Sequence, residues 1–423
     1  MTLGSKNTSK IIRETKKVKI IKNYAQQLVL LSEEKMKSLS CFSFSNGANV
    51  EGQNNRIQFL NKKGSATDNI TGKQHFKDLN VSSLKGNIEN YIGMAQIPIG
   101  LAGPVLVNGT HAIGDFLIPM ATTEGALVAS YNRGMKACRL SGGITSVCLS
   151  EGVQRSPFFK FKNIATVGLF IQWAHEKMTV FREIVKKTSR FALLNNVKTN
   201  VEGNTVILTF EYSTGDAAGQ NMVTICTDQI CKYILENFET KPCEWYIESN
   251  YAGDKKATAL SFSNVRGKKV TAEIVLPRVV VAKVLKTTPG KIAQYWQAST
   301  LAVIQSGAIG AQGHVANGLT AMFIACGQDV ACISESAVGI TRMEVNRDGN
   351  LYVSLTLPSL IVGTVGGGTS LPTQQECLQI MDCAGVGKAK KFAEICCAVA
   401  LTGEISIAAA MSANHFTSAA GMK

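Results

Sequence analysis

Residues 197–212, VKTNVEGNTVILTFEY, decide the fold of one part of this chain. Two runs rich in β-branched and aromatic residues flank Gly203-Asn204, a pair typical of tight turns, so the sequence predicts two antiparallel strands joined as a hairpin. Apolar spacing before the hairpin predicts one long helix over 170–193, and similar spacing after it predicts a helix over 221–238. Helix, hairpin and helix together indicate a small α+β unit.

The sequence that follows this unit is richer in Ala and Gly. The runs KATALSF (256–262) and KKVTAEIVL (268–276) predict strands. Residues 300–326 and 389–411 predict helices whose small side chains allow close approach in a buried layer. Glu404 interrupts the second of these apolar segments, so we expect no membrane span.

The N-terminal fifth of the chain carries most of its excess positive charge. The 423 residues include 44 Lys and Arg against 30 Asp and Glu, a net charge of +14. Residues 1–87 hold 15 basic and 6 acidic residues, a net +9, which leaves only +5 on the remainder. A basic arm of this kind indicates a solvated or partner-facing segment, and no nucleic-acid-binding motif accompanies it. Within the arm we expect a short helix over 20–37 and a loop over 45–71.

The twelve Cys residues contain no CxxC pair, so they do not predict a metal site. Most are surrounded by Ala, Val and Ile, and no export signal precedes them. We therefore expect small buried thiols in a reducing compartment, and we place the protein in the cytoplasm.

Two motifs in the first half of the chain could carry chemistry, and each has an ordinary structural alternative. In MATTEG (120–125), Glu124 is either a functional acid or a helix-start Glu stabilised by the helix dipole. STGDAAGQNM (213–222) is either an anion-binding helix N-terminus or an ordinary turn capped by Asp216. No Gly-rich dinucleotide or P-loop pattern is present, so a dinucleotide would have to bind without one.

Three further candidates lie in the second half. Lys255, in the loop SNYAGDKKA, is either part of a solvated turn or the cation of an oxyanion-stabilising site. Asp329 follows an apolar helix and could be a plain loop residue. His415, near the chain end, could be an ordinary surface residue.

Taken in order, these motifs resemble the catalytic part of the 3-hydroxy-3-methylglutaryl-CoA (HMG-CoA) reductase family, and most closely the class shared by archaea and eukaryotes. The similar segments are ENYIGMAQIPIGLAGP (89–104), MATTEGALVASYNRG (120–134), GDAAGQNM (215–222), the DKK loop, ACGQD, TVGGGT (364–369) and the terminal NHF. The resemblance implies an α+β fold with a large helix-rich catalytic and CoA-binding domain, residues 88–157 and 246–423. It also implies an inserted, small ferredoxin-like NADP-binding domain, residues 158–245, after a basic N-terminal segment, 1–87, that is partly helical or flexible.

The family reduces the thioester of HMG-CoA to the alcohol of mevalonate in a four-electron, NADPH-dependent reaction of isoprenoid synthesis. By resemblance, Lys255 matches the cation that stabilises the oxyanion, and Glu124 matches a proton donor whose pKa burial could raise. Asp329 matches the carboxylate that holds the Lys and the Glu together. His415 matches the group that protonates the departing CoA thiolate.

The resemblance also assigns binding residues and a quaternary structure. Ser189 and Arg190 match the residues that grip the 2′-phosphate of NADPH, because a guanidinium beside a hydroxyl suits a phosphate. The other cofactor positions are Asp216, Ala218, Gly219, Gln220, Asn221, Gly366, Gly367 and Gly368. The acyl-CoA positions are Ser130, Asn132, Arg133, Arg155, Asp254, Lys256, Lys286 and Asn317. The family's active site lies between subunits, which implies a homodimer or a dimer of dimers.

The sequence departs from the family pattern where the acyl carboxylate is expected to bind. Ala298-Ser299 stands where the family has a Lys, and the nearest cation is Lys291. Glu248 stands where the family has a Ser that meets this carboxylate, and DAMGMN has become DAAGQN. Losing a cation and gaining an anion disfavours an anionic acyl group by ~1 kcal/mol or more per pair. Two alternatives therefore stay open, namely a paralogue that reduces a different, uncharged acyl-CoA, and a non-catalytic nucleotide-binding descendant.

Overall fold

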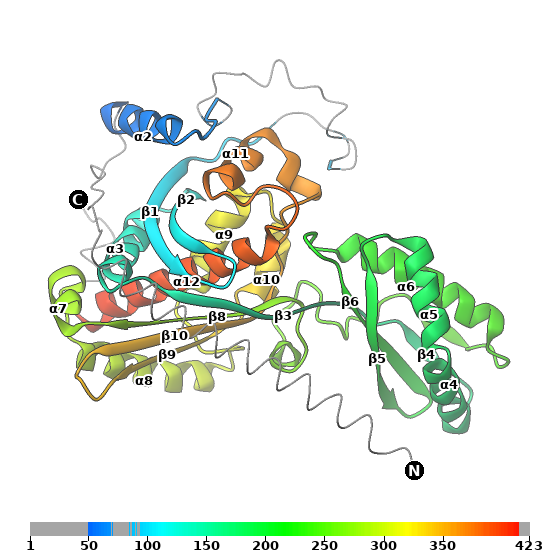
Figure 1. The fold of residues 1–423 in the computed structure, drawn as a ribbon. Coiled ribbons are helices and arrows are strands. Elements are labelled where there is room, and N and C mark those ends of the chain that lie inside the picture. The colour runs from blue at the N-terminus through cyan, green and yellow to red at the C-terminus, as the bar shows by residue number, and fades with distance from the viewer. Residues whose placement is uncertain are drawn as a thin grey trace, which may run out of the picture.

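The computed structural model describes residues 50–68, 70, 84, 87, 88, 90 and 94–413, and one sheet joins its two parts (Figure 1). The strand order is β7–β4–β6–β3–β8–β10–β9, with β5 paired to β6 off this path, and every pairing is antiparallel. The strands are β3 (Thr145–Arg155), β4 (Phe158–Lys160), β5 (Leu193–Glu202), β6 (Thr205–Ser213), β7 (Glu244–Tyr246), β8 (Gly267–Leu276), β9 (Ile340–Val345) and β10 (Leu351–Leu360). Strand β3 connects the parts, because its first half pairs with β8 and its last three residues pair with β6.

The smaller part has the βαββαβ order and the strand order β7–β4–β6–β5 of a ferredoxin-like fold. Its helices are α4 (Ile164–Glu176), α5 (Met178–Thr188) and α6 (Gln220–Asn237). A separate hydrophobic cluster rich in Phe lies between these helices and the sheet. The α+β prediction and the hairpin turn at Gly203-Asn204 are confirmed.

Three local predictions are wrong. The helix expected over 170–193 is two helices that break at Lys177, and Leu193 already begins β5. The buried apolar residues keep helical spacing across the break, so periodicity does not reveal it.

The second error is at residues 256–262. This segment is not a strand but ends in the 3₁₀-helix η3 (Ala259–Phe262), where the Ser261 hydroxyl bonds to the Thr258 carbonyl at 2.7 Å. The third error is in the loop expected over 45–71, which contains helix α2 (Val50–Lys62). Leu60 of α2 is buried, a contact that a polar Asn-rich sequence does not indicate. The helix predicted over 20–37 lies outside the described residues.

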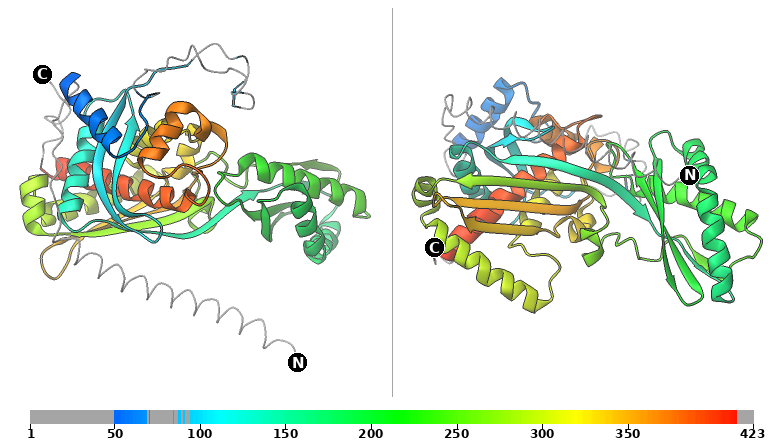
Figure 2. Two further views of the ribbon diagram at one scale, coloured as in Figure 1. Left: turned by 45° about the horizontal axis from the view of Figure 1, so that its top comes forward. Right: turned by 60° about the horizontal axis from the view of Figure 1, so that its bottom comes forward.

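The larger part is built around helix α12 (Ala389–Ser412), as the two turned views show (Figure 2). Strands β1 (Ile99–Asn108) and β2 (Ile113–Ala121) form a second, two-stranded sheet. The helices packed nearby are α3 (Leu127–Leu140), α8 (Pro289–Ser306), α9 (Val315–Ala325) and α11 (Pro372–Ile380). The short elements are α7 (Arg278–Val280), η4 (Val281–Leu285), η5 (Val330–Cys332), α10 (Ile333–Ser336) and η6 (Gly367–Ser370).

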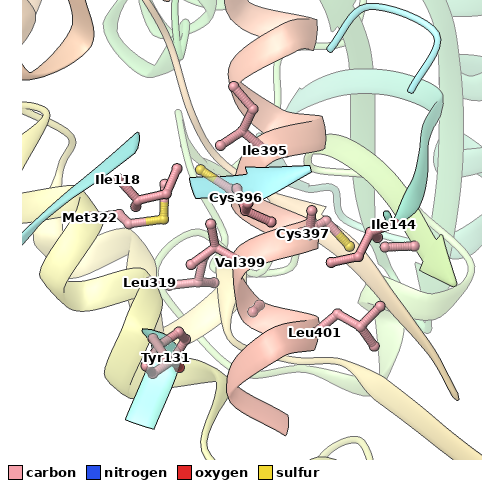
Figure 3. Packing of buried hydrophobic residues seen from close by; sticks show 14 of the residues in the cluster. Ile118, Tyr131, Ile144, Leu319, Met322, Ile395, Cys396, Cys397, Val399 and Leu401 are labelled. Atoms are coloured by element: carbon pink, nitrogen blue, oxygen red, sulfur yellow. The ribbon is translucent and has the colours of Figure 1, made fainter. Parts of the chain in front are cut away.

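Helix α12 is the core of the larger part. Residues along it, including Ile395, Cys396 and Leu401, lie among buried side chains from α3, α9 and β2 (Figure 3). In length and composition α12 could cross a membrane, but most of it is buried inside the protein, which is typical of a core helix. Nine of the eleven cysteines in the described residues are buried, and all eleven are free thiols, as predicted. Burial raises the pKa of the Cys396 thiol.

Two buried carboxylates fix loops to α12. Glu394 accepts the backbone N–H groups of His111 and Ala112, each at 2.8 Å, after the β1 strand. Glu404 accepts the N–H groups of Gly313 at 2.7 Å and His314 at 2.8 Å, just before α9. Burial pushes the pKa of Glu404 up, but these hydrogen bonds outweigh it and the net shift is downward. The charge that interrupts the apolar run therefore anchors the start of α9.

The contact between α3 and α12 predicts a specific glycine requirement. A Cβ on Gly134 of α3 would stand 2.0 Å from the Thr402 carbonyl oxygen of α12. We expect Gly134→Ala to lower the free energy of unfolding by about 1–3 kcal/mol, measured by denaturant titration.

The matched control is Gly168→Ala in α4. Nothing lies within 4 Å of the added methyl group, so this change should raise stability by about 0.5–1 kcal/mol through helix propensity. Equal effects of the two substitutions would contradict the close packing.

Candidate active site

Lys255 and Asp329 form an exposed ion pair. The Lys255 Nζ lies 2.8 Å from Asp329 Oδ2, and 45% and 46% of the two side chains are exposed. Asp329 Oδ1 also accepts the Ala331 N–H at 3.0 Å, which fixes the carboxylate. The hydrogen bond that Lys255 donates to the Asp329 carboxylate raises the pKa of Lys255. The pair therefore presents a fixed ammonium group that can hydrogen-bond a developing oxyanion.

A buried ionic network holds the backbone of Lys255. Lys255 has a positive φ of 56°, and its N–H donates to Glu335 Oε1 at 3.0 Å. Glu335 Oε2 accepts from Arg266 Nε at 2.7 Å, and only 2% and 4% of these two side chains are exposed. Burial raises the pKa of Glu335, and Arg266 opposes that shift.

Arg266 links this network to the start of α6. Its Nη2 donates to Asp254 Oδ1 at 3.0 Å and to Gln220 Oε1 at 3.1 Å. Sequence reasoning missed Arg266 and Glu335 as site residues. The only indication in the sequence is that Glu335 follows Asp329 by six residues. Sequence alone does not distinguish a buried charged residue from one on the surface.

Glu124 lies at the N-terminal end of α9, whereas Asp329 follows the C-terminal end of this helix. Its N–H donates to Thr122 Oγ1 at 3.0 Å, and its Oε1 accepts from Asn317 Nδ2 at 3.5 Å. Glu124 precedes Ala126, the N-cap residue of α3, and the first turn of α3 contains no acidic residue. The helix-dipole interpretation is therefore not supported. The Glu124 side chain is exposed, so contacts within its own chain do not give the burial expected for a proton donor.

The structure does not bring Glu124 to the Lys255–Asp329 pair. Asn317 lies in the first turn of α9, and Asp329 follows the end of this helix. The rise from Asn317 to Ala325 corresponds to about 12 Å at 1.5 Å per residue. Among the described residues Asp329 pairs with Lys255, and Glu124 pairs with Asn317 instead.

The predicted acyl-CoA residues divide between these two ends. Near Glu124, the Ser130 hydroxyl lies 3.0 Å from that of Ser406, and Arg133 Nη2 donates to the Ser406 carbonyl at 2.7 Å. Asn132 Oδ1 accepts the Gly103 N–H at 2.7 Å.

At the Lys255 end, Lys256 Nζ donates to Asn250 Oδ1 at 3.1 Å, and Arg155 pairs with Asp254 at 3.2 Å. Lys286 lies at neither of these pairs. It is exposed at the end of η4, which packs against α3, and its φ is 58°.

The candidate dinucleotide turn, residues 213–222, rests against the TVGGGT loop. The Asp216 carbonyl accepts the Thr364 N–H at 2.9 Å. The Asp216 carboxylate accepts the N–H groups of Gly387 at 2.8 Å and Ala389 at 3.1 Å, at the start of α12. Asp216 thus caps α12 and not α6, whose N-cap is Gly219 with a φ of 83°.

The predicted 2′-phosphate residues lie near the same turn. Ser189 is the C-cap residue of α5, and Arg190 follows it. The next strand pairs Leu193 with Ser213, the residue at which the turn begins. Arg190 is exposed, and the Ser189 hydroxyl accepts the N–H groups of Phe191 and Ala192, each at 3.2 Å. A hollow of 230 Å³ beside the turn is lined by Thr214, Gly215, Ala218, Lys268 and others.

The departures from the family pattern also have defined places. Ser299 lies in the middle of α8 and lines a 350 Å³ cavity with Trp296 and Glu404. Lys291 is exposed in the first turn of α8. Glu248 faces Arg155, with Oε2 at 3.0 Å from Nη1. His415 lies outside the described residues. Within the described part of the chain, no three His, Cys, Asp or Glu side chains gather as a metal site.

Comparisons with known proteins agree with the motifs. A sequence model of hydroxymethylglutaryl-coenzyme A reductase matches residues 52–420. The chain is 46% identical over 343 residues to the 3-hydroxy-3-methylglutaryl-coenzyme A reductase of Pyrococcus horikoshii, covering 79% of this chain and 82% of that one. It is 38% identical over 339 residues to the sea urchin (Strongylocentrotus purpuratus) reductase, covering 77% of this chain and 36% of the longer relative.

A solved structure shares the fold. The class II reductase of Streptococcus pneumoniae bound to NADPH superposes with a TM-score of 0.69 at 19% identity, covering 88% of this chain and all of that one. At this identity the likeness supports the fold alone.

The ion pair with Asp329 predicts how Lys255 titrates. Asp329→Asn removes the anion that favours the ammonium form, so the pKa of Lys255 should fall and its charge should be lost at lower pH. An NMR titration of labelled lysine side chains measures this shift. Asp382→Asn, which removes the partner of Lys388 and Lys391, is the matched control and should leave Lys255 unchanged. An unaltered Lys255 pKa in Asp329→Asn would contradict the coupling.

Proposed function

The chain belongs to the hydroxymethylglutaryl-coenzyme A reductase family, and on that basis we propose that it reduces HMG-CoA with two NADPH and two protons to mevalonate, CoA and two NADP⁺. The observation that carries the proposal is the Lys255–Asp329 pair, held in place by Glu335 and Arg266. Mevalonate formation assigns the protein to isoprenoid synthesis. The archaeal and sea urchin relatives support the predicted class.

The residues of the smaller part fit a dinucleotide. Among the described residues Gln220 Nε2 is buried without a hydrogen-bond partner at the start of α6, two residues after Ala218, which lines the hollow next to the turn. Gly366 and Gly367 have open space where a side chain would stand, so a planar ring can approach their backbone. The exposed guanidinium of Arg190 suits a 2′-phosphate. When bound there, NADPH supplies the hydrides of the reaction.

Lys255 stabilises the negative charge that develops on the carbonyl oxygen of the substrate. Its ammonium is already oriented by Asp329, and its backbone is fixed through Glu335, so little reorganisation is needed when charge develops. The same cation serves both reductions, because each converts a carbonyl oxygen into an oxyanion.

Glu124 supplies the proton that completes the alcohol, and Asn317 orients its carboxyl group. We assign His415 the protonation of the departing CoA thiolate, because an imidazole titrates near neutral pH. Ser130, Arg133 and Lys286 remain the proposed contacts for CoA, since two of the three are cations that can meet its phosphates.

The separation of Glu124 from Lys255 supports an active site shared by two subunits. About 12 Å of helix α9 lies between their partners, whereas both groups must reach one carbonyl oxygen. A symmetric homodimer can place Glu124 of one subunit over Lys255 of the other, and the contact would also bury the exposed Glu124. We therefore propose a homodimer, or a dimer of dimers.

The domain division and the location complete the proposal. Residues 158–245 are the NADP-binding domain, because they hold their own hydrophobic cluster, and residues 88–157 and 246–423 are the catalytic domain. We propose a cytoplasmic location, which the free thiols among the described residues support.

The first test is the activity of single variants. Lys255→Ala should lower kcat by about 10²–10³-fold because the oxyanion loses its cation, and Glu124→Gln should lower it by about 10²–10⁴-fold. The assay follows NADPH oxidation and mevalonate formation with HMG-CoA. Full activity in Lys255→Ala, at unchanged folding, would refute the assigned role.

The second test is complementation between inactive subunits. When Lys255→Ala and Glu124→Gln chains are co-expressed, mixed dimers keep one intact site, so about a quarter of the wild-type activity should return. Each variant expressed alone is the control. No recovery, with mixed dimers demonstrated by differential tags, would place each complete site within one chain.

A further inference from the structure

Glu248 and Arg155 form a nearly buried ion pair at the edge of the candidate active site. Glu248 Oε2 lies 3.0 Å from Arg155 Nη1, and 18% and 8% of the side chains are exposed. The same carboxylate oxygen accepts the Ser156 N–H at 3.3 Å. Glu248 is therefore held firmly on the guanidinium group.

Arg155 also belongs to the Lys255 loop. Its Nη1 lies 3.2 Å from Asp254 Oδ2, and Asp254 is the residue before Lys255. Arg155 Nη2 donates to the Gln220 carbonyl at 3.5 Å, where α6 begins. Arg155 therefore lies between the loop of Lys255, the cation proposed to stabilise the oxyanion, and the proposed dinucleotide turn.

In the ion pairs of this cluster, carboxyl groups outnumber guanidinium groups, while the Lys255 and Lys256 ammonium groups lie at its exposed edge. Two guanidinium groups, of Arg155 and Arg266, face three carboxyl groups, of Glu248, Asp254 and Glu335. Within the described part of the chain, two polar atoms of the Glu248–Arg155 pair, Glu248 Oε1 and Arg155 Nε, are buried without a hydrogen-bond partner. Burying polar atoms without hydrogen bonds costs free energy. A ligand that bonds to these atoms, or one that displaces Glu248 from Arg155, would remove that cost.

The acyl group of HMG-CoA ends in a carboxylate four carbon–carbon bonds from the thioester carbon, a span of about 5 Å. Because Arg155 pairs with Asp254, the residue before Lys255, we place this carboxylate beside Arg155 when the thioester oxygen is on Lys255. There it meets a guanidinium that already holds the Glu248 carboxylate. Coulomb repulsion opposes it until Glu248 moves away.

We propose that Glu248 is an internal carboxylate that occupies Arg155 and sets acyl selectivity by weakening the binding of an acyl group with its own carboxylate. The inference rests on the proposed function for the position of the thioester. An anionic acyl group must displace Glu248 from Arg155, whereas an uncharged acyl group of the same shape leaves the ion pair intact.

The test compares two ligands by isothermal titration calorimetry on the full-length protein. One is HMG-CoA, and the other is 3-hydroxy-3-methylpentanoyl-CoA, in which a methyl group replaces the carboxylate. Glu248→Gln should tighten HMG-CoA binding by about tenfold and change the Kd of the uncharged analogue by less than about twofold. Equal changes for the two ligands, or no change, would overturn the proposal.

Two further variants isolate the cause. Glu211→Gln removes a carboxylate of similar exposure, 21%, that pairs with Lys198 and leaves Arg155 paired. It should change neither Kd. Glu248→Ser serves as a second replacement if Glu248→Gln proves unstable in thermal denaturation, and it should tighten HMG-CoA binding in the same way.

Binding and turnover separate this inference from the proposed function. If the Kd ratio shifts as expected but no NADPH is oxidised with either ligand, the proposed function fails and the selectivity assignment stands. If the enzyme reduces HMG-CoA but the ratio does not move in Glu248→Gln, the selectivity assignment alone fails. Absence of binding of both ligands to all variants would overturn both.

Discussion

The buried ion pair between Arg266 and Glu335 is the interaction on which the candidate site depends. Two charges with 4% and 2% of their side chains exposed are costly to desolvate, and only their mutual hydrogen bond and further partners offset that cost. Those partners are the Lys255 N–H, the Asp254 carboxylate and the Gln220 side chain. One buried pair therefore fixes both the Lys255 backbone and the end of the proposed cofactor turn, where α6 begins. Removing Arg266 would leave the buried Glu335 carboxylate without its cation, which would lower the free energy of unfolding by about 3–5 kcal/mol.

The packing of the larger part sets the distance between Glu124 and the Lys255–Asp329 pair. Helix α12 packs closely against α3, and α3 against α9, while Glu404 ties the N-terminal end of α9 to α12. The Asn317–Glu124 pair and the Lys255–Asp329 pair are consequently held at opposite ends of one helix. This separation, together with the exposure of Glu124 in its own chain, is the reason for the proposal of a site shared by two subunits.

Local pattern predicted much of the fold, because strands, hairpin turns and apolar helices have local signals. The hairpin at Gly203-Asn204, strand β8 and helix α12 were predictable for this reason. Contacts between residues far apart in the chain could not be predicted from local patterns. Arg155 lies 93 residues from Glu248, and Asp216 caps a helix more than 170 residues away. The family resemblance named Lys255 and Asp329, but only the fold shows that Arg266 and Glu335 support them.

The most direct measurement of the central claim is an experimental structure of the protein with HMG-CoA and NADP⁺ bound. The account predicts that the thioester oxygen lies within hydrogen-bond distance of Lys255 Nζ, with Glu124 approaching it from a second subunit. A thioester bound away from Lys255, or a site completed by Glu124 of the same chain, would contradict it.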